Sequence, residues 1–376
     1  MAQAPPPLDA EELARSALVR DRVAAAADSS GFVPFDRFME IALYGRDVGF
    51  YARARSPLGT EGEFYTAAHV TPLFARTIAE RLRATRRALG NPSPFRIVEL
   101  GPGDGRLARE VVSALADEPP GIEYVLVDRA AARADESERR TRSEGGTIPT
   151  RRSASLADVG PFTGAVLANE FLDAQPARRL RRQAGTWREV GVRVTGSGLE
   201  WADSEMVRAV PGDPAPSAEG PELTMEFSPA AEGAVREIAD HLDAGVAILI
   251  DFGLTEPELF RAHPTGTLAA VRGHRFLADP LAAPGTADLS TFVDFTRIRG
   301  SAQRSGLVEL AFRSQAEALG AWGFPALRDG AVAATTSPEE KVRLQMAVKN
   351  LLFGFERFHA LELAPPGSAA TLGGLR

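Results

Sequence analysis

The chain has 376 residues, of which 44% are apolar, a formal net charge of −7 and no cysteine. This apolar content is enough for a large buried core, in one elaborated domain or in two. The acidic balance argues against a nucleic-acid partner, and the lack of cysteine excludes disulfides and thiolate chemistry. No apolar run is long enough to span a bilayer, so we expect no membrane partner.

The first 90 residues predict a tail followed by a helical lid. Residues 1–9 are rich in Pro and Ala, which is typical of disorder, and they lack a signal peptide's apolar core. We therefore expect a cytoplasmic protein. Residues 10–90 contain helical patterns at 10–27, 38–43 and 72–89, separated by loops with glycines and aromatic residues. A segment ahead of a nucleotide-binding strand often closes over the ligand, with Gly62, Phe64 and Thr66 as candidate contacts.

A glycine-rich turn at residues 101–105 is the most informative stretch. It follows an apolar run, 95–100, and leads into a helical pattern, which together predict the strand, loop and helix of a nucleotide-binding unit. The glycines alternate after Glu99 and so depart from the G-x-G-x-x-G of dinucleotide enzymes. This form is similar to the S-adenosylmethionine (SAM) loop of methyltransferases. We predict that Glu99, Gly101 and Gly103 contact SAM.

Two further turns are candidates for the adenosine end of the cofactor. An apolar strand at 122–127 ends at Asp128, whose carboxylate can accept both ribose hydroxyls, at about the ~20-residue separation expected for such an acid. A helix at 130–143 and a third strand with its turn at 150–156 follow. In this architecture that turn commonly touches adenine, which makes Ser155 and Leu156 candidates.

Polar residues follow the next buried strand, 164–168. They include Asn169, Glu170 and Asp173. The carboxyl ends of parallel strands face the ligand crevice, so Asn169 is a candidate for SAM binding, and Glu170 and Asp173 for the acceptor side. Asn169 and Asp173 are also common helix caps, which is the competing interpretation.

The rest of the chain predicts insertions into one domain that spans residues 91–376. Residues 178–226 alternate like a small antiparallel sheet, and 254–300 contain a long loop-like stretch from 255 to 288. Asp251 ends another apolar strand, where it either contacts substrate or holds a loop. Residues 342–359 predict a closing helical region with a break at Gly354. The fold class is thus α/β, a Rossmann-like SAM methyltransferase sheet with an N-terminal helical lid and antiparallel and loop insertions.

Several motifs in fixed order resemble the MidA-like methyltransferase family, which includes a mitochondrial arginine methyltransferase of complex I assembly. They run over nearly the whole chain: Phe38-Met39 to Leu43-Tyr44, Gly49-Phe50-Tyr51, Glu63-Phe64 with Thr66-Ala67, Glu99 to Gly103, Asn169-Glu170 with Asp173-Ala174, Asp251-Phe252-Gly253, Gly266-Thr267-Leu268, Arg272 to Arg275, Pro284-Gly285, Asp288 and Val293-Asp294-Phe295. This resemblance implies SAM as the cofactor and a protein arginine as an acceptor.

Departures from the family pattern leave the acceptor open. This chain has Ala68-His69 where the family tends to have Pro-Glu, Phe252 in place of tyrosine, Gln175 in place of leucine, and Ala269 in place of arginine. A protein arginine and a small-molecule oxygen or nitrogen acceptor therefore both remain candidates.

The chemistry of methyl transfer assigns roles to these residues. A guanidinium acceptor is always cationic, so carboxylates such as Glu170 and Asp173 would hold it and draw charge from the attacking nitrogen. A hydroxyl acceptor would instead use a general base, for which His274 or His69 is available. A lone loop histidine is more often a surface residue, which is the competing interpretation. No spacing of His, Asp and Glu resembles a metal site.

Two other classes of function remain as alternatives. An NAD(P)-dependent oxidoreductase would use the same strand, loop and helix, although the glycine spacing argues against it. A non-catalytic assembly factor that retains SAM would keep the same loop. A homodimer is left open.

Overall fold

The computed structural model describes residues 7–52, 66–144, 148–196, 198–207 and 222–375. The chain divides into two compact units. Unit 1 comprises residues 1–57, 173–233 and 253–297, and unit 2 comprises residues 58–172, 234–252 and 298–376. Each unit is described by itself. The expected division into a tail, a lid and one domain with insertions stays a prediction.

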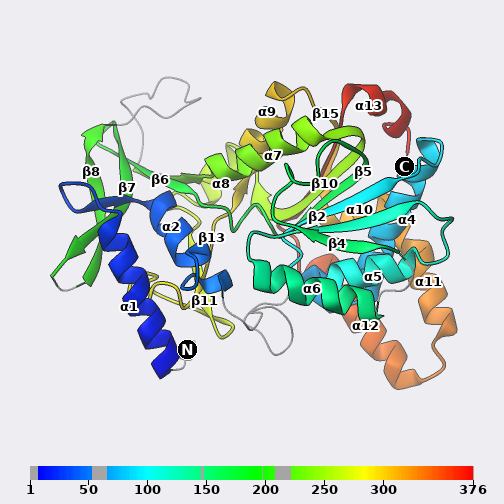
Figure 1. Ribbon diagram of the computed structural model, residues 1–376, viewed down its shortest axis with the longest axis horizontal. Coiled ribbons are helices and arrows are strands. Elements are labelled where there is room, and N and C mark those ends of the chain that lie inside the picture. The colour runs from blue at the N-terminus through cyan, green and yellow to red at the C-terminus, as the bar shows by residue number, and fades with distance from the viewer. Residues whose placement is uncertain (1–6, 53–65, 145–147, 197, 208–221, 376) are drawn as a thin grey trace. The chain divides into compact units, whose positions relative to one another are not determined.

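Unit 2 is built on a mixed sheet. Its strand order is β15-β16-β10-β5-β2-β3-β4. The neighbouring strands from β10 to β4 in this order are parallel to one another. β16 runs antiparallel to both β10 and β15. The strands are β2 (Phe95–Leu100), β3 (Ile122–Val127), β4 (Thr150–Ser153), β5 (Phe162–Asn169), β10 (Leu242–Leu254), β15 (Val308–Ser314) and β16 (Phe358–Ala364). Figure 1 shows this sheet with its covering helices.

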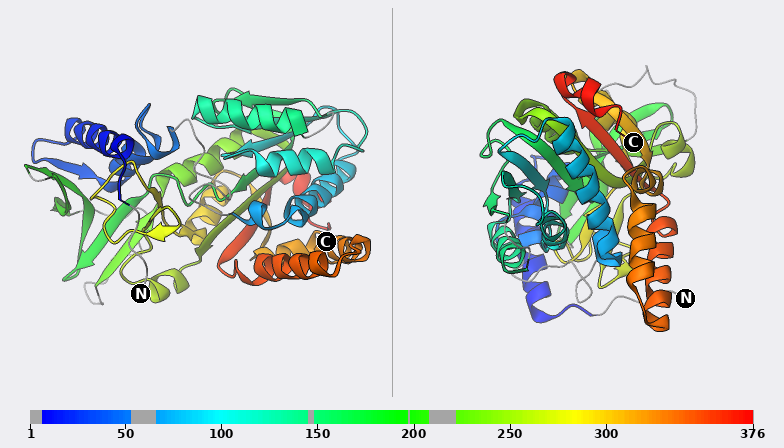
Figure 2. Two further views of the ribbon diagram at one scale, coloured as in Figure 1. Left: turned by 90° about the horizontal axis from the view of Figure 1, so that it is seen from below. Right: turned by 90° about the vertical axis from the view of Figure 1, so that its right-hand side faces the viewer.

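The helices of unit 2 bury the apolar faces of the sheet. They are α3 (Ala67–Val70), α4 (Pro72–Ala88), α5 (Arg106–Ala114), α6 (Ala131–Glu144), α10 (Gln315–Ala321), α11 (Phe324–Ala334), α12 (Pro338–Phe353) and α13 (Pro366–Leu372); α7 (Pro229–His241) and α9 (Phe295–Arg304) each begin in unit 1 and end in unit 2. One core joins the α4 residues Phe74 and Ile78 to Ile97 and Tyr124 of the sheet. α11 and α12 run side by side, in orange, in both views of Figure 2.

The strand order has its switch point at the edge where the sequence predicted a ligand site. β2 pairs with β3 on one side and with β5 on the other, so the chain changes direction across the sheet at β2. In open parallel sheets, ligands bind at the carboxyl ends of the strands at such a switch point. Gly101, Asp128 and Glu170 directly follow β2, β3 and β5. The α/β fold class with its Rossmann-like order is therefore confirmed.

Unit 1 is built on an antiparallel sheet that joins distant segments. β1 (Phe32–Pro34) pairs with β7 (Thr186–Thr195), and β7 also pairs with β6 (Arg178–Gln183) and β8 (Gly198–Val207); β9 (Leu223–Phe227) pairs with β6. The helices α1 (Ala10–Ala25) and α2 (Phe35–Tyr44) and the short 3-10 turn η1 (Phe50–Ala52) come from the N-terminal part. The expected antiparallel insertion is confirmed, and β1 extends it.

The stretch 255–288 is mostly irregular, as expected, but it is not one continuous loop. The short elements α8 (Glu258–Ala262), β11 (Ala269–Arg272) and β12 (Arg275–Phe276) lie within it. β11 pairs with both β12 and β13 (Asp288–Ser290), and β14 (Val293–Asp294) pairs with the end of β10. These strands of two to four residues are too short to produce a visible alternation of apolar and polar side chains.

The closing helical region is helix up to Phe353 and breaks at Gly354 as expected, but residues 355–359 are not helical. α12 ends at Phe353 with Gly354 as its cap, and residues 358–364 form β16 rather than more helix. The residues of β16 include Ala, Leu and Glu, which favour helices, but the strand is inserted between β10 and β15, and this tertiary setting overrides local preference. Within the described residues, no helix is both long and apolar enough to cross a bilayer.

Candidate functional site

The glycine loop adopts a conformation that only glycine takes easily. Gly101, Gly103 and Gly105 have φ angles of 67°, 58° and 77°, in the left-handed region. A side chain at Gly101 would place its Cβ 2.7 Å from the Phe171 ring, so both the angle and the space require glycine there. The Gly101 N–H donates to the Val127 carbonyl at 2.9 Å, which ties the loop to the end of β3.

α6 packs against the same loop. The Ser137 hydroxyl donates to the Gly103 carbonyl at 2.8 Å, and a Cβ at Gly105 would lie 3.0–3.1 Å from Ser137. Ser137 is fully buried. The sequence analysis missed this residue, because nothing in the Arg- and Glu-rich pattern of α6 sets one serine apart. The loop is therefore held by hydrogen bonds to the end of β3 and to α6.

Glu99 lies buried at the end of β2, where the Tyr124 hydroxyl donates to its Oε2 at 2.7 Å. Burial raises the pKa of Glu99 to about 7, with the Asp104 charge adding to the rise and the Tyr124 hydrogen bond opposing it. A carboxyl with this pKa can hold or release a proton near neutral pH. It can thus accept from a cationic or hydroxyl group of a ligand.

The residues expected at the adenosine end lie after β3 and β4. Asp128 is 7% exposed, and its Oδ1 accepts from the Ala130 N–H at 2.8 Å, which fixes the carboxylate in a tight turn. Leu156 is buried. The Ser155 hydroxyl donates to Asp158 Oδ2 at 2.7 Å, so the turn after β4 is held by its own side chains.

Glu170 sits in a strained turn after β5. Its φ of 52° is unusual for a residue with a side chain, and such strain concentrates at functional sites. Its carboxylate accepts from the Ala67 N–H at 3.1 Å and from Asn169 Nδ2 at 3.3 Å. Asp251 holds the turn, because its Oδ2 accepts from the N–H groups of Phe171 and Leu172 at 3.1 and 2.7 Å.

The electrostatics of this turn favour the neutral form of Glu170. Burial raises its pKa to about 8, and the Asp251 charge adds to the rise, while the hydrogen bonds from Ala67 and Asn169 oppose it. A cation placed beside Glu170 would reverse this effect and favour the carboxylate. The turn is therefore a place where a cationic ligand changes the charge of the protein.

A chain of hydrogen bonds connects α3 with the glycine loop. His69 Nδ1 lies 2.9 Å from the Thr66 hydroxyl, and His69 Nε2 lies 3.2 Å from Asp104 Oδ2. Burial raises the pKa of Asp104, but the hydrogen bond and charge of His69 outweigh it, so the pKa is lowered overall. From the sequence, His69 was predicted only as an alternative general base, because its partner Asp104 is 35 residues away. Gly62 and Phe64, the other lid candidates, lie outside the described residues.

Asp173 and His274 belong to unit 1. Asp173 is 8% exposed, and its carbonyl accepts from the Thr291 N–H at 3.0 Å. His274 has a φ of 61° at the turn between β11 and β12. The expected pairing of Glu170 with Asp173, and the role of His274 as a base, stay predictions.

A second group in unit 1 joins three of the motifs quoted for the family. The Tyr51 hydroxyl donates to Asp288 Oδ1 at 2.6 Å, and the rings of Tyr44 and Tyr51 are 5.3 Å apart. Burial raises the pKa of Tyr51 well above its usual value, and the charges of Asp288 and Asp173 add to the rise. Two acids and two aromatic rings thus share one part of unit 1.

The edge at the glycine loop fits SAM. Asn169 Oδ1 is buried and has no hydrogen-bond partner among the described residues, so it can accept from a ligand's ammonium or hydroxyl group. The left-handed loop and the Asp128 carboxylate supply the features expected for the amino acid and ribose ends. Over the same residues, His, Asp and Glu side chains form no group of three that could hold a metal ion.

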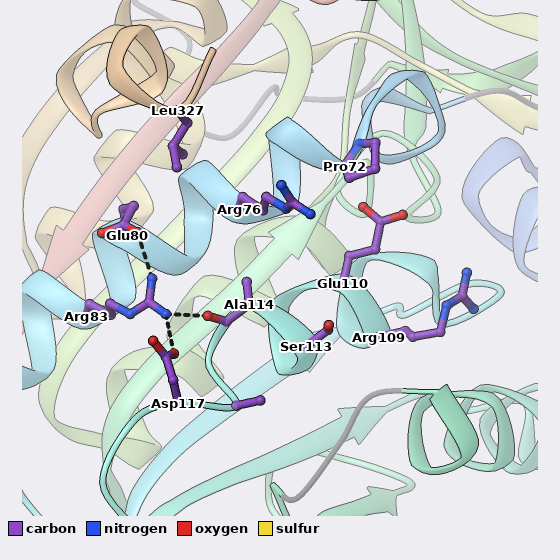
Figure 3. A pocket seen from close by; sticks show the side chains of 11 residues that line it. Pro72, Arg76, Glu80, Arg83, Arg109, Glu110, Ser113, Ala114, Asp117 and Leu327 are labelled. Carbon is purple, nitrogen blue, oxygen red and sulfur yellow. Dashed lines mark hydrogen bonds and ion pairs between the residues drawn. The ribbon is translucent and has the colours of Figure 1, made fainter. Parts of the chain in front are cut away.

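A separate cavity of about 590 Å³ lies on the helical layer of unit 2 (Figure 3). It is lined from α4, α5 and α11 and contains none of the predicted site residues. In Figure 3, Arg83 on its wall pairs with Glu80 at 2.6 Å and with Asp117 at 2.8 Å. This cavity is therefore distinct from the edge that carries the glycine loop.

Comparisons with known proteins agree with this geometry. The family Methyltransf_28, S-adenosyl-L-methionine-dependent methyltransferases, matches residues 77–312. The chain is similar to the Drosophila melanogaster protein arginine methyltransferase NDUFAF7 homolog, mitochondrial, with 30% identity over 74% of this chain and 69% of the relative. The Mus musculus protein arginine methyltransferase NDUFAF7, mitochondrial, is 28% identical over 73% of this chain and 67% of the relative.

A solved structure extends the likeness to the whole fold. It is the crystal structure of a COG1565 superfamily member from Burkholderia thailandensis bound to S-adenosyl-homocysteine. Its identity to this chain is 28%, its TM-score is 0.85, and the match covers 96% of this chain and 95% of that one. A native structure of a COG1565 superfamily protein from the same organism gives 27% identity and a TM-score of 0.84.

Two expectations from the sequence are corrected by these comparisons. The dinucleotide-dependent oxidoreductase alternative is wrong, because the family and the solved relative are methyltransferase-like and the bound molecule there is S-adenosyl-homocysteine. The cytoplasmic location is contradicted by the similar Drosophila and mouse proteins, which are named as mitochondrial. A net charge and the lack of a signal peptide's core carry no information on that compartment.

Proposed function

This chain belongs to the family of S-adenosyl-L-methionine-dependent methyltransferases, and from that premise we propose that it methylates an arginine side chain of a protein. The relatives named protein arginine methyltransferase support this acceptor. The observation that carries the proposal is the Glu170 turn, in which a carboxyl group at the carboxyl edge of β5 is held in a strained conformation.

The cofactor side uses the residues that follow β2, β3 and β5. Glu99, Gly101 and Gly103 surround the amino acid end of SAM, Asp128 holds the ribose, and the Asn169 Oδ1 accepts from the ligand. Thr66 contacts the cofactor from the start of α3, and Ser155 and Leu156 border the adenine; Gly62 and Phe64 belong to the same proposed set. The buried positions of Glu99, Asp128 and Leu156 support this arrangement, because hydrogen bonds to the ligand are stronger where water is excluded.

The acceptor side uses carboxylates. When bound, SAM supplies an electrophilic methyl group, and the protein must bring a nitrogen lone pair within about 3–3.5 Å of it in line with the bond that breaks. Glu170 binds the guanidinium and holds its positive charge away from the attacking nitrogen. Asp173 remains the second carboxylate that the sequence predicts for the acceptor. Ionised Glu170 is favoured once the cation is beside it, so acceptor binding itself releases the proton of the free protein.

A small-molecule hydroxyl acceptor is the second candidate. The contact of His69 with Asp104 and Thr66 favours it, because a carboxylate on one ring nitrogen orients an imidazole and supports its use as a base. His274 is the other candidate base in that case. Methylation would then depend on a histidine rather than on Glu170.

A methyl-transfer assay separates the two acceptors. The purified chain is incubated with methyl-labelled SAM and an extract of the source cells, and label is counted in the protein and small-molecule fractions. We expect label in protein, recovered as methylarginine after hydrolysis, and loss of that label with Glu170→Gln. Label confined to small molecules, with Glu170→Gln active and His69→Gln inactive, would overturn the arginine proposal.

A further inference from the structure

α12 has apolar residues on two opposite faces. Leu344, Val348, Leu351 and Leu352 pack on the core of unit 2. On the other side Val342, Met346 and Phe353 are 54%, 68% and 64% exposed. A helix that packs on one core needs only one apolar stripe. The second stripe is therefore not explained by the fold of unit 2.

The outer stripe has the spacing of a coiled-coil seam. Its positions are Glu339, Val342, Met346, Lys349 and Phe353, and the steps between them are three, four, three and four residues. In heptad terms they are alternating a and d positions. All five side chains are exposed. Glu339 and Lys349 form no ion pair with any other described residue, so the charged members of the stripe are available to a partner.

We propose that the outer stripe of α12, Glu339 to Phe353, binds the same stripe of a second copy of this chain in antiparallel orientation. In antiparallel seams an a position faces a d position of the partner. A two-fold axis at the level of Leu344 sets Val342 against the partner's Met346, and Glu339 against the partner's Lys349. The symmetry repeats each pair, so two apolar layers are flanked by two ion pairs.

The choice of a second copy rests on this self-complementarity. A two-fold interface needs one surface that is complementary to itself. The part of the stripe from Glu339 to Lys349 carries an acid at one end and a base at the other with Val342 and Met346 between, while Phe353 lies beyond the paired positions. No other register pairs both charges. Shifting the register by one heptad sets Met346 against the partner's Lys349 and leaves both copies of Glu339 without a basic partner.

The interface is small, so we expect a reversible dimer. A 16-residue helix is about 24 Å long, and a single helix pair buries less surface than the ~1,200–2,000 Å² of most stable complexes. The dimer should therefore form in the micromolar range and be weakened by salt, since two of its layers are ion pairs.

Sedimentation equilibrium of the full chain tests the proposal, at about 1–100 µM and low salt. The wild-type chain should dimerise. Lys349→Glu and Glu339→Lys should each raise the dimer dissociation constant by about tenfold or more, because each sets like charges against each other twice. The double variant Glu339→Lys/Lys349→Glu should dimerise like the wild type. Lys341→Glu changes the net charge by the same amount as Lys349→Glu, off the stripe, and is the matched control for that variant.

A second measurement tests the apolar layers directly. Because the chain has no cysteine, the variant Val342→Cys/Met346→Cys can form disulfides only at those positions. Mild oxidation should link two chains, whereas Lys341→Cys should not link them. Met346→Glu, which lies on the surface, should leave thermal unfolding unchanged and abolish the dimer. A wild-type chain that is monomeric throughout, a dimer that survives Met346→Glu, or failure of the charge swap to restore association would overturn the proposal.

Discussion

Units 1 and 2 differ in how their important residues are brought together. In unit 2, Glu99, Gly101, Asp128 and Glu170 each lie at the end of a parallel strand, so local sequence places them at one edge of the sheet. In unit 1, the cluster around Tyr51 depends on contacts between segments more than 200 residues apart. The strand-end residues of unit 2 are thus encoded locally, and the cluster around Tyr51 in unit 1 is encoded by tertiary contacts.

The same contrast appears in the ion pairs of the two units. In unit 1, Arg272 pairs with Glu12 at 3.2 Å and Arg179 pairs with Glu226 at 3.1 Å, each joining remote segments. Unit 2 has such pairs too, but its proposed cofactor residues do not depend on them. We therefore expect substitutions in unit 2 to separate into cofactor and acceptor effects, and those in unit 1 to affect acceptor and stability together.

The largest expected effect is that of Glu170→Gln. We expect turnover to fall by about a hundredfold or more, because the guanidinium loses a charged partner, while S-adenosylhomocysteine affinity stays within about twofold. Rate and calorimetric measurements check the two values. Glu123→Gln removes a carboxylate on the outer part of β3 and should leave both values unchanged. Full methylation activity in Glu170→Gln would show that Glu170 does not bind the acceptor.

Gly101→Ala should act on the cofactor instead. The new Cβ would meet the Phe171 ring at 2.7 Å, so the loop must shift, and we expect S-adenosylhomocysteine affinity to fall by about tenfold or more. Gly160→Ala is the matched control, because its φ of 70° carries the same backbone strain while nothing lies within 4 Å. Equal affinities of the two variants would contradict the proposed place of the cofactor.

The pH dependence of activity tests the charge of Glu170. Its pKa of about 8 means that the free protein is mostly protonated at neutral pH. If an ionised Glu170 is required, kcat/KM should rise about tenfold per pH unit below pH 8 and level off above it. Glu170→Gln should abolish this rise of kcat/KM with pH. A flat profile between pH 6 and 9 in the wild type would argue against a required carboxylate.

The free energy of unfolding should also depend on the ionisation of Glu170, but it should fall with rising pH, whereas activity should rise. The raised pKa means that the folded chain binds a proton more tightly than the unfolded chain, whose Glu170 titrates near 4.5. This contribution is fully present below pH 4.5 and is lost as the pH rises through 8. Denaturant unfolding should therefore show a smaller loss of stability over that window in Glu170→Gln than in the wild type.

The smallest expected effect is that of Tyr51→Phe in unit 1. Removing the hydroxyl leaves the largely buried Asp288 without this donor, which should cost about 1–3 kcal/mol of unfolding free energy. If unit 1 binds the acceptor, KM for the acceptor should rise by a few fold while S-adenosylhomocysteine affinity is unchanged. An effect on cofactor affinity alone would contradict the contrast between the two units.

The part of the site that could be predicted from the sequence has strong local patterns. The run before Gly101 is apolar and short, the glycines alternate directly after it, and Asp128 comes directly after a strand. Hence the strands, the glycine turn and the edge where Glu170 lies were predictable. The role of Asp251 was left open, since its hydrogen bonds to Phe171 and Leu172 exist only once β10 lies beside β5.

The part of the site and fold that could not be predicted depends on contacts between residues far apart in the sequence. The contact of His69 with Asp104 joins α3 to the glycine loop, and Ser137 is one serine among the polar residues of α6. The first two residues of β16, Phe358 and His359, fall within the predicted helical region, and the strand forms because its partners β10 and β15 lie beside it. Its Glu362 is buried and pairs with Arg81 at 2.6 Å, while the Trp322 indole donates to the other oxygen at 3.1 Å.

The position of β16 between β10 and β15 has a consequence for synthesis on the ribosome. Both neighbours emerge before the strand that joins them, and at ~5–20 residues per second β15 waits several seconds for it. During that time two strand edges are open to other chains, which invites aggregation. We expect nascent chains that stop before residue 358 to be captured by chaperones or degraded, so that the last strand to be translated decides whether the whole sheet survives.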